Sequence, residues 1–141
     1  MGTDTTELWL ASLELAKLEA CVELMFWTAY ADGKVDPEER AVFETHVRRA
    51  TQGQIGPDLI RAVLSYIEGS VLVADRDARL RSIAERVDEP RMRRAALSLA
   101  AAVAMADGKL TDDERALLEQ AAAAFEIAPP DVAELIAGAA T

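Results

Sequence analysis

The amino-acid sequence predicts an all-α protein, a compact bundle of about seven helices, and three observations carry this prediction. Alanine is the commonest residue, aromatic residues are scarce, and half of the 141 residues are apolar, which is typical of a globular helical chain. Capping residues and prolines precede apolar stretches of helical period. No segment combines sustained alternation with β-branched residues, so no strand is predicted.

The first apolar stretch begins at a capping box formed by Asp4 and Glu7 and reaches Asp32 without a proline or glycine. It forms either one helix or two helices that meet near residues 16–19. Its later half is apolar on most sides, which predicts a central position in the core. Cys21 lies in this half and is expected to be a small core residue.

A strong helix-start signal follows at residues 36–39, Asp-Pro-Glu-Glu. Asp36 is the expected N-cap, Pro37 takes the first helical position, and Glu39 completes a capping box. The segment Thr-Gln-Gly-Gln-Ile-Gly at 51–56 should end this helix. The helix that begins after Asp36 is expected to direct three apolar residues toward the core: Val42, Phe43 and Val47.

Five further helices are predicted from prolines, capping residues and glycines. Thr111 and Glu114 form a second capping box at the start of the sixth helix. The predicted ranges are 57–69, 71 or 75 to 87, 90–106, 111 onward, and 129 or 130 to 138.

A short motif occurs twice in the chain, 75 positions apart. Residues 31–44 and 106–119 share eight of fourteen positions, including Ala-Asp-Gly-Lys and Glu-Arg-Ala. Each copy follows an apolar helix and precedes a capping box. We therefore expect a single domain over residues 1–141 with repeat halves at about 18–68 and 93–138, packed as a pseudo-twofold pair of helical hairpins.

Most motif residues have a structural role at a helix–helix corner. Gly33 and Gly108 follow helices, where a residue with positive φ is often needed and glycine adopts it at low cost. The next lysine is favoured beside exposed helix carbonyls, and the aliphatic residue after it can pack against the core. These residues are Lys34 and Val35 in the first copy, and Lys109 and Leu110 in the second.

Asp32 and Asp107 fit the corners less well. A carboxylate at a helix C-terminus meets the negative end of the helix dipole, at a cost of about 0.3–1 kcal/mol. A hydrogen bond from a loop N–H, the following lysine, or a bound cation would offset this cost. Bonding within the turn is the favoured explanation, and a metal is the alternative.

The first corner also resembles the second half of an EF-hand calcium loop. That loop needs oxygen ligands at its first and third positions as well, and the sequence does not supply a matching set. A tight EF-hand site is therefore not expected. The residues at these positions are Thr28 and Tyr30 in the first copy, and Val103 and Met105 in the second.

The two corners could instead pool their carboxylates around one divalent cation if they pack together. Ca²⁺ or Mg²⁺ is expected rather than Zn²⁺, because carboxylate oxygens are hard donors. Glu39 and Glu114 have a competing role in the capping boxes, which is the favoured one. The candidate metal ligands are Asp32, Asp36, Glu39, Asp107 and Glu114.

The net charge of −10 argues against nucleic-acid binding, which needs a cationic face. A middle segment, residues 46–94, is nevertheless net positive and rich in arginine. Its arginines form either a solvated helix face, which is favoured, or a patch that docks an acidic partner. They are Arg76, Arg79, Arg81, Arg86, Arg91, Arg93 and Arg94.

No catalytic constellation is recognisable, so the chain is not expected to be an enzyme. His46 is the only histidine, has no cysteine at ligand spacing, and is expected on a helix surface. No glycine-rich phosphate loop follows a strand. Four aromatic residues at helical spacing are expected in the core: Trp9, Phe26, Trp27 and Phe43.

No signal-like segment precedes the first helix, and no apolar run is long enough to span a bilayer. We therefore expect a cytoplasmic protein without direct membrane insertion.

The two corners, "YADGKVDPEERAVF" and "MADGKLTDDERALL", resemble the duplicated Ala-Asp-Gly…Glu signature of TerB-like tellurite-resistance proteins. The resemblance covers about residues 18–137, and the same fold resembles the N-terminal domain of the co-chaperone DjlA. It implies a bundle of about seven helices with acidic residues on one side. It also implies a role in a stress response linked to tellurite, metals or phage defence, within a membrane-associated complex.

The acidic positions of the family fall on Asp32, Glu39, Asp107 and Glu114. Thr111 stands where the first copy has Asp36, which weakens a symmetric pair of metal sites.

Two functions remain open. The first is a non-enzymatic TerB-like module in stress response, which binds a divalent cation or a partner protein through an acidic face around the two corners. The alternative is a protein-interaction scaffold with purely structural corners and an arginine-rich docking patch.

Overall fold

The computed structural model describes residues 15–30, 36–70, 76–106 and 108–139, and these residues form seven α-helices and no strand. The all-α prediction is thereby confirmed. The predicted capping box of Asp4 and Glu7, and Trp9, lie outside the described residues, as do Asp32 and Asp107. The helices are α2 (Leu15–Ala29), α3 (Pro37–Ala50), α4 (Pro57–Ser70), α5 (Arg76–Arg86), α6 (Pro90–Ala104), α7 (Asp112–Ala124) and α8 (Pro129–Ala139).

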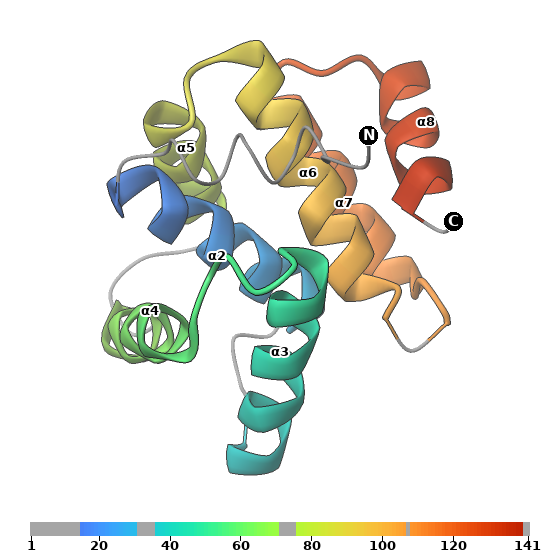
Figure 1. Ribbon diagram of the computed structural model, residues 1–141. Helices are drawn as coiled ribbons and strands as arrows, with labels where there is room; N and C mark the ends of the chain where they lie inside the picture. The colour runs from blue at the N-terminus through green and yellow to red at the C-terminus, as the bar shows by residue number, and fades with distance from the viewer. Residues whose placement is uncertain (1–14, 31–35, 71–75, 107, 140–141) are drawn as a thin grey trace, which may run out of the picture.

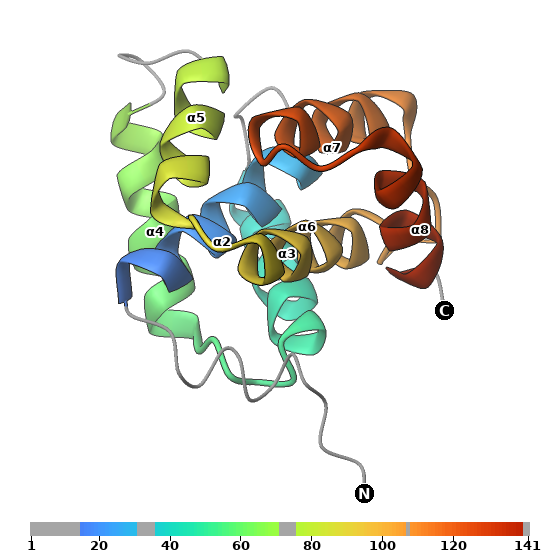
Figure 2. The ribbon, with the colours of Figure 1, turned by 90° about the horizontal axis from the view of Figure 1, so that it is seen from above.

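Helices α2 and α6 cross at the centre of the molecule, and the other helices pack around them (Figure 1). Helices α4 and α5 contact α2, α8 contacts α6, and α7 contacts α2, α5 and α6. Seen from above, α4 and α5 lie on one side of the molecule and α8 on the other (Figure 2). Helix α3 packs against α6, α2 and α4.

The later half of α2 is enclosed on every side, as its apolar sequence predicts. All residues from Ala20 to Thr28 are buried, including Glu23 and Thr28. Cys21 is fully buried, and burial raises the pKa of its thiol to about 12 despite the nearby Arg86 charge. It is therefore a neutral core side chain, as expected.

Two expectations about individual residues and helix ends are wrong. Val42 is 48% exposed instead of pointing inward, because α3 lies at the edge of the bundle and buries a narrow face that holds Phe43 and Val47. The fifth predicted helix, α6, ends at Ala104 and not at Ala106. The helix gives way there to a tighter turn with an i→i−3 hydrogen bond, in which the N–H of Ala106 donates to Val103 O at 3.2 Å.

Helices α3 and α7 end in the same hydrogen-bonded turn. In α3, the N–H of Gly53 donates to Arg48 O at 2.7 Å; in α7, the N–H of Ile127 donates to Ala122 O at 2.9 Å. The residue before each donor adopts a left-handed conformation, with φ of 55° at Gln52 and 61° at Glu126. This is a Schellman motif with a non-glycine residue at the position that glycine usually occupies.

None of the helices in the described parts of the chain is long and apolar enough to cross a membrane.

Candidate functional site

The first corner joins α2 to α3 through the predicted capping box. Asp36 Oδ1 accepts a hydrogen bond from the Glu39 N–H at 2.8 Å, and Glu39 Oε1 accepts one from the Asp36 N–H at 3.1 Å. Pro37 follows the cap at the first helical position. These contacts satisfy two backbone donors that a helix start would otherwise leave unpaired.

Tyr30, at the end of α2, spans the first corner. Its hydroxyl donates to the backbone carbonyl of Glu39 at 3.0 Å. Burial, followed by the nearby charges of Glu39 and Asp36, raises the pKa of Tyr30 to about 12. The phenol is therefore neutral at physiological pH and acts as a hydrogen-bond donor that fixes α3 to α2.

The second corner joins α6 to α7 with the same kind of cap. Thr111 accepts from the Glu114 N–H at 3.1 Å, and Glu114 Oε1 accepts from the Thr111 N–H at 2.8 Å. Gly108 has a φ of 90°, the positive value expected for a glycine after a helix. Leu110 is partly buried and packs against the core, as predicted.

The predicted metal ligands are only partly placed by the structure. Asp36, Glu39 and Glu114 belong to the two capping boxes, which is the structural role expected for both glutamates. Among the described residues, no group of three or more histidine, cysteine or acidic side chains has an arrangement that could hold a metal ion. Asp32 and Asp107 lie outside these residues, so their role as ligands stays a prediction.

Each corner leads into a helix whose first turn is acidic. Helix α3 begins at the lower edge of Figure 1, whereas α7 begins at the right of the molecule, beyond the lower end of α6. The first turn of α3 carries Glu38 and Glu39, and the first turn of α7 carries Asp112, Asp113 and Glu114. All except the partly buried Glu114 are exposed.

The position equivalent to the first ligand of an EF-hand is already engaged. The Thr28 hydroxyl is buried and donates to the carbonyl of Leu24, one turn earlier in α2, at 2.8 Å. The helix thus continues through this position, in agreement with the expectation that no EF-hand loop forms.

A buried ion cluster around Glu23 was not predicted from the sequence. Arg79 Nε and Nη2 donate to the two carboxylate oxygens, each at 2.7 Å, and Arg86 Nη2 donates to Oε1 at 2.9 Å. Trp27 Nε1 donates to Oε2 at 3.1 Å. The carboxylate is 1% exposed, so these four bonds replace its lost hydration and fasten α2 to α5.

Burial alone would raise the pKa of Glu23, but the hydrogen bonds from Arg79, Arg86 and Trp27 outweigh it and hold the pKa below its usual value. Arg79 also lies over the ring of Tyr66 on α4, with 5.2 Å from the guanidinium carbon to the ring centroid. One signal could have revealed the cluster: a glutamate in the middle of the otherwise apolar run Ala-Cys-Val-Glu-Leu-Met-Phe-Trp.

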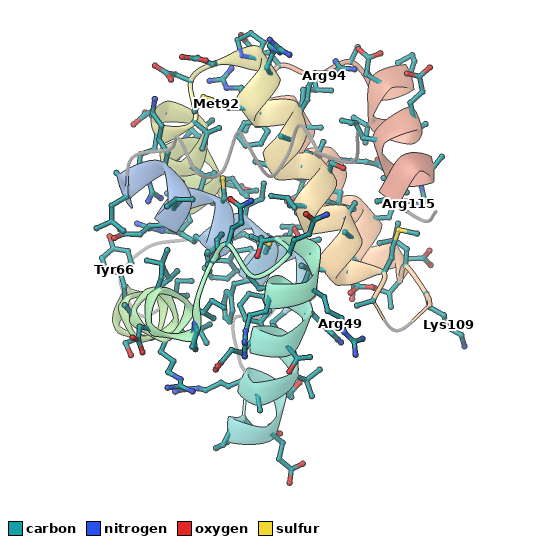
Figure 3. All side chains as sticks on the ribbon, viewed as in Figure 1. Arg49, Tyr66, Met92, Arg94, Lys109 and Arg115 are labelled. Carbon is teal, nitrogen blue, oxygen red and sulfur yellow. The ribbon has the colours of Figure 1, made fainter. Side chains whose placement is uncertain are left out.

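Arg93 also has an internal role. Its guanidinium donates to the carbonyls of Ala84, Val87 and Phe125, at 2.8, 2.7 and 3.2 Å. It thus satisfies carbonyls at the ends of both α5 and α7. Arg94 reaches from α6 to Asp131 of α8 at 3.5 Å, at the upper end of Figure 3. Several arginines of the segment therefore form bonds within the molecule: Arg79, Arg86, Arg93 and Arg94.

The chain matches a known protein family over most of its length. The model of the family described as "Tellurite resistance protein TerB" matches residues 20–137. No curated protein and no solved structure shows significant similarity to the chain. The matched region includes both corners and almost all of the seven helices. On this match, the chain belongs to the TerB family.

Proposed function

We propose that this protein is a non-enzymatic, cytoplasmic TerB-like module of a tellurite- or metal-linked stress response, and that its acidic corner face binds a divalent cation, Ca²⁺ or Mg²⁺. One observation carries the proposal: each Asp-Gly corner leads directly into a helix with an acidic first turn, α3 in the first copy and α7 in the second. Carboxylates held close together repel one another, and a divalent cation relieves that repulsion.

The capping boxes are compatible with a bound cation. Each box uses Oε1 of Glu39 or Glu114, and the second oxygen of each carboxylate could accept a metal without loss of the cap. Asp32 and Asp107 would complete the ligand set. A cation would also neutralise their unfavourable position after a helix end.

Thermal unfolding of metal-free protein with added Ca²⁺ or Mg²⁺ tests the proposal. A ligand that binds only the native state stabilises it by about 1.4 kcal/mol at ten times its Kd, which should raise the melting temperature by several degrees. The Asp32→Asn/Asp107→Asn double variant should lose this increase.

A matched control removes two carboxylates elsewhere. Asp58 and Asp77 lie in the first turns of α4 and α5 and outside the corners, so the Asp58→Asn/Asp77→Asn variant should keep the full metal response. If the wild-type protein shows no shift at millimolar metal, or if both double variants respond equally, cation binding at the corners is wrong.

The stress-response part of the proposal has its own test. Cells that depend on this protein for growth on tellurite should be rescued by the wild-type chain and not by the Asp32→Asn/Asp107→Asn variant. Equal rescue by both would separate the biological role from the acidic corners.

A basic partner protein is the alternative occupant of the corner face. The arginine-rich docking patch is less favoured, because Arg79, Arg86 and Arg93 bond inside the molecule. Its exposed members include Arg81 and Arg91. Charge reversal at these two positions leaves the internal bonds intact, and loss of a partner on reversal would favour the scaffold.

A further inference from the structure

The seam between α7 and α8 opens into a groove of about 630 Å³. Helix α8 packs mainly on α6 and less on α7, so the seam is not closed by side chains of the two helices. Its base is apolar, and Val132 and Ile136 are buried there. The size lies within the range of about 300–1,000 Å³ that is usual for binding pockets.

The groove is elongated. Its lining residues on α7 extend from Arg115 to Ala123, about 12 Å along the helix at 1.5 Å per residue, and continue through residues 126–128 of the connecting turn. On α8 they extend from Pro129 to Ile136. Two helices joined by a short turn thus border a trough, whose shape suits a helical segment better than a round small molecule.

The rim of the groove is mainly acidic. Glu119 and Glu126 line it and are exposed. Arg93 approaches Glu126 to 3.9 Å, but the Glu126 side chain remains 87% exposed and accessible to a partner. Arg115 is the single basic lining residue and lies near the C-terminal end of α8 (Figure 3). Residues 95–141 together hold eight acidic and two basic residues.

We propose that this α7–α8 groove binds a cationic amphipathic helix of a partner protein. The apolar side chains of such a helix, at positions i, i+3 or i+4, and i+7, would enter the groove. Lysine or arginine residues beside them would face Glu119 and Glu126. The apolar contacts supply most of the affinity, and the charges select the partner. The binding surface is separate from the carboxylates proposed for the cation.

Two labelled synthetic peptides of about four helical turns test the inference by fluorescence anisotropy. Both carry leucines at the helical spacing, and they differ in having lysine or glutamate at the flanking positions. The lysine peptide should bind with a micromolar Kd, and the glutamate peptide should bind at least about tenfold more weakly.

A matched pair of variants locates the binding site. Ala123 and Ala116 are both exposed on α7, but only Ala123 lines the groove. Ala123→Trp should fill the groove and weaken binding of the lysine peptide by at least about tenfold. Ala116→Trp should leave the Kd unchanged within about twofold.

A second pair tests the charges and remains informative if a tryptophan variant does not fold. Glu119 lines the groove, whereas the exposed Glu134 on α8 does not. Glu119→Lys should weaken the lysine peptide and strengthen the glutamate peptide, and Glu134→Lys should do neither. The inference would be overturned if the lysine peptide showed no saturable binding up to about 1 mM, or if the protein bound the glutamate peptide equally or more tightly. It would also be overturned if the protein bound anionic phospholipid vesicles in preference to the lysine peptide.

Discussion

The two central helices, α2 and α6, precede the two copies of the same corner motif, yet they bury very different side chains. Phe26 and Trp27 of α2 correspond, 75 positions later, to Ala101 and Ala102 of α6. Position 23 is a buried glutamate, whereas the corresponding residue of α6 is Ser98. The two copies are alike at the helix boundaries and differ in the core.

Helix α2 fills its surroundings with aromatic rings. The Phe26 ring centroid lies 5.5 Å from that of Trp27 and 6.0 Å from that of Phe43 on α3. Helix α6 instead buries small side chains, among them Ala96, Ala100 and Ala101. Helix α6 contacts α2, α3, α7 and α8, and α2 contacts α3, α4, α5, α6 and α7, so both helices are central although they bury different side chains.

The motif therefore specifies the geometry of the corner rather than the composition of the core. A helix start requires particular hydrogen-bonding groups at fixed positions. A core requires a filled volume, which many combinations of apolar residues provide. Substitutions can test this division, first at Glu23, the residue that distinguishes α2 most from α6.

Glu23→Gln should have the largest effect. The substitution keeps the shape of the side chain but leaves Arg79 and Arg86 without their buried counter-charge, which should cost about 3–5 kcal/mol of unfolding free energy. Chemical denaturation measures this value. Ser98→Ala on α6 is the matched control and should change stability by no more than about 0.5 kcal/mol. Equal effects of the two substitutions would contradict the proposed asymmetry.

The same residue predicts a pH dependence. The pKa of folded Glu23 lies below the ordinary value of 4.5, so its stabilisation is fully present above that value and is lost as the pH falls through the folded pKa. The stability difference between wild type and Glu23→Gln should therefore shrink as the pH falls below 4.5. A difference that stays constant down to the acid transition would argue against this ion cluster.

Ala101→Leu should be the next largest change, at about 1–3 kcal/mol of destabilisation. Ala101 is fully buried in α6, so the added methylenes would force neighbouring helices apart. Differential scanning calorimetry should show a lower melting temperature. Ala106→Leu, at an exposed position after the helix, is the control. Tolerance of leucine at position 101 would mean that close packing of α6 does not matter.

Loss of either N-cap should cost about 1 kcal/mol, and the cost should be similar at the two corners. Asp36→Ala removes the acceptor at the start of α3, and Thr111→Ala removes the one at the start of α7. Urea denaturation of the two variants tests this equality. A clear difference between them would show that the surrounding core alters the strength of the cap.

The helix starts could be predicted because their signals are local. Asp36, Pro57 and Pro129 each begin or immediately precede a helix as the sequence indicates. The capping pairs lie three residues apart, so the hydrogen bonds they form depend on few other parts of the fold.

The Glu23 cluster and the α7–α8 groove could not be predicted in the same way. Glu23 lies 56 and 63 residues from the two arginines that pair with it, and only the packing of α5 on α2 brings them together. The inward direction of Val42 was predicted wrongly because helical period does not reveal how wide a face the bundle covers. For the candidate site, the sequence indicated the capping roles correctly, and Asp32 and Asp107 remain predicted ligands.

Substitutions at the ends of α3 and α7 should have the smallest effect on stability, and they should stabilise the protein instead of destabilising it. Gln52 and Glu126 occupy left-handed conformations after α3 and α7, where a side chain costs about 1–2 kcal/mol and glycine does not. Glycine also increases the entropy of the unfolded chain, which offsets part of this gain. Gln52→Gly and Glu126→Gly should therefore each stabilise the protein by only about 0.5–1 kcal/mol. Thermal unfolding should show two similar increases in melting temperature. If only one variant gains stability, the two helix ends are not equivalent, and the likeness of the two halves would be confined to the caps at their helix starts.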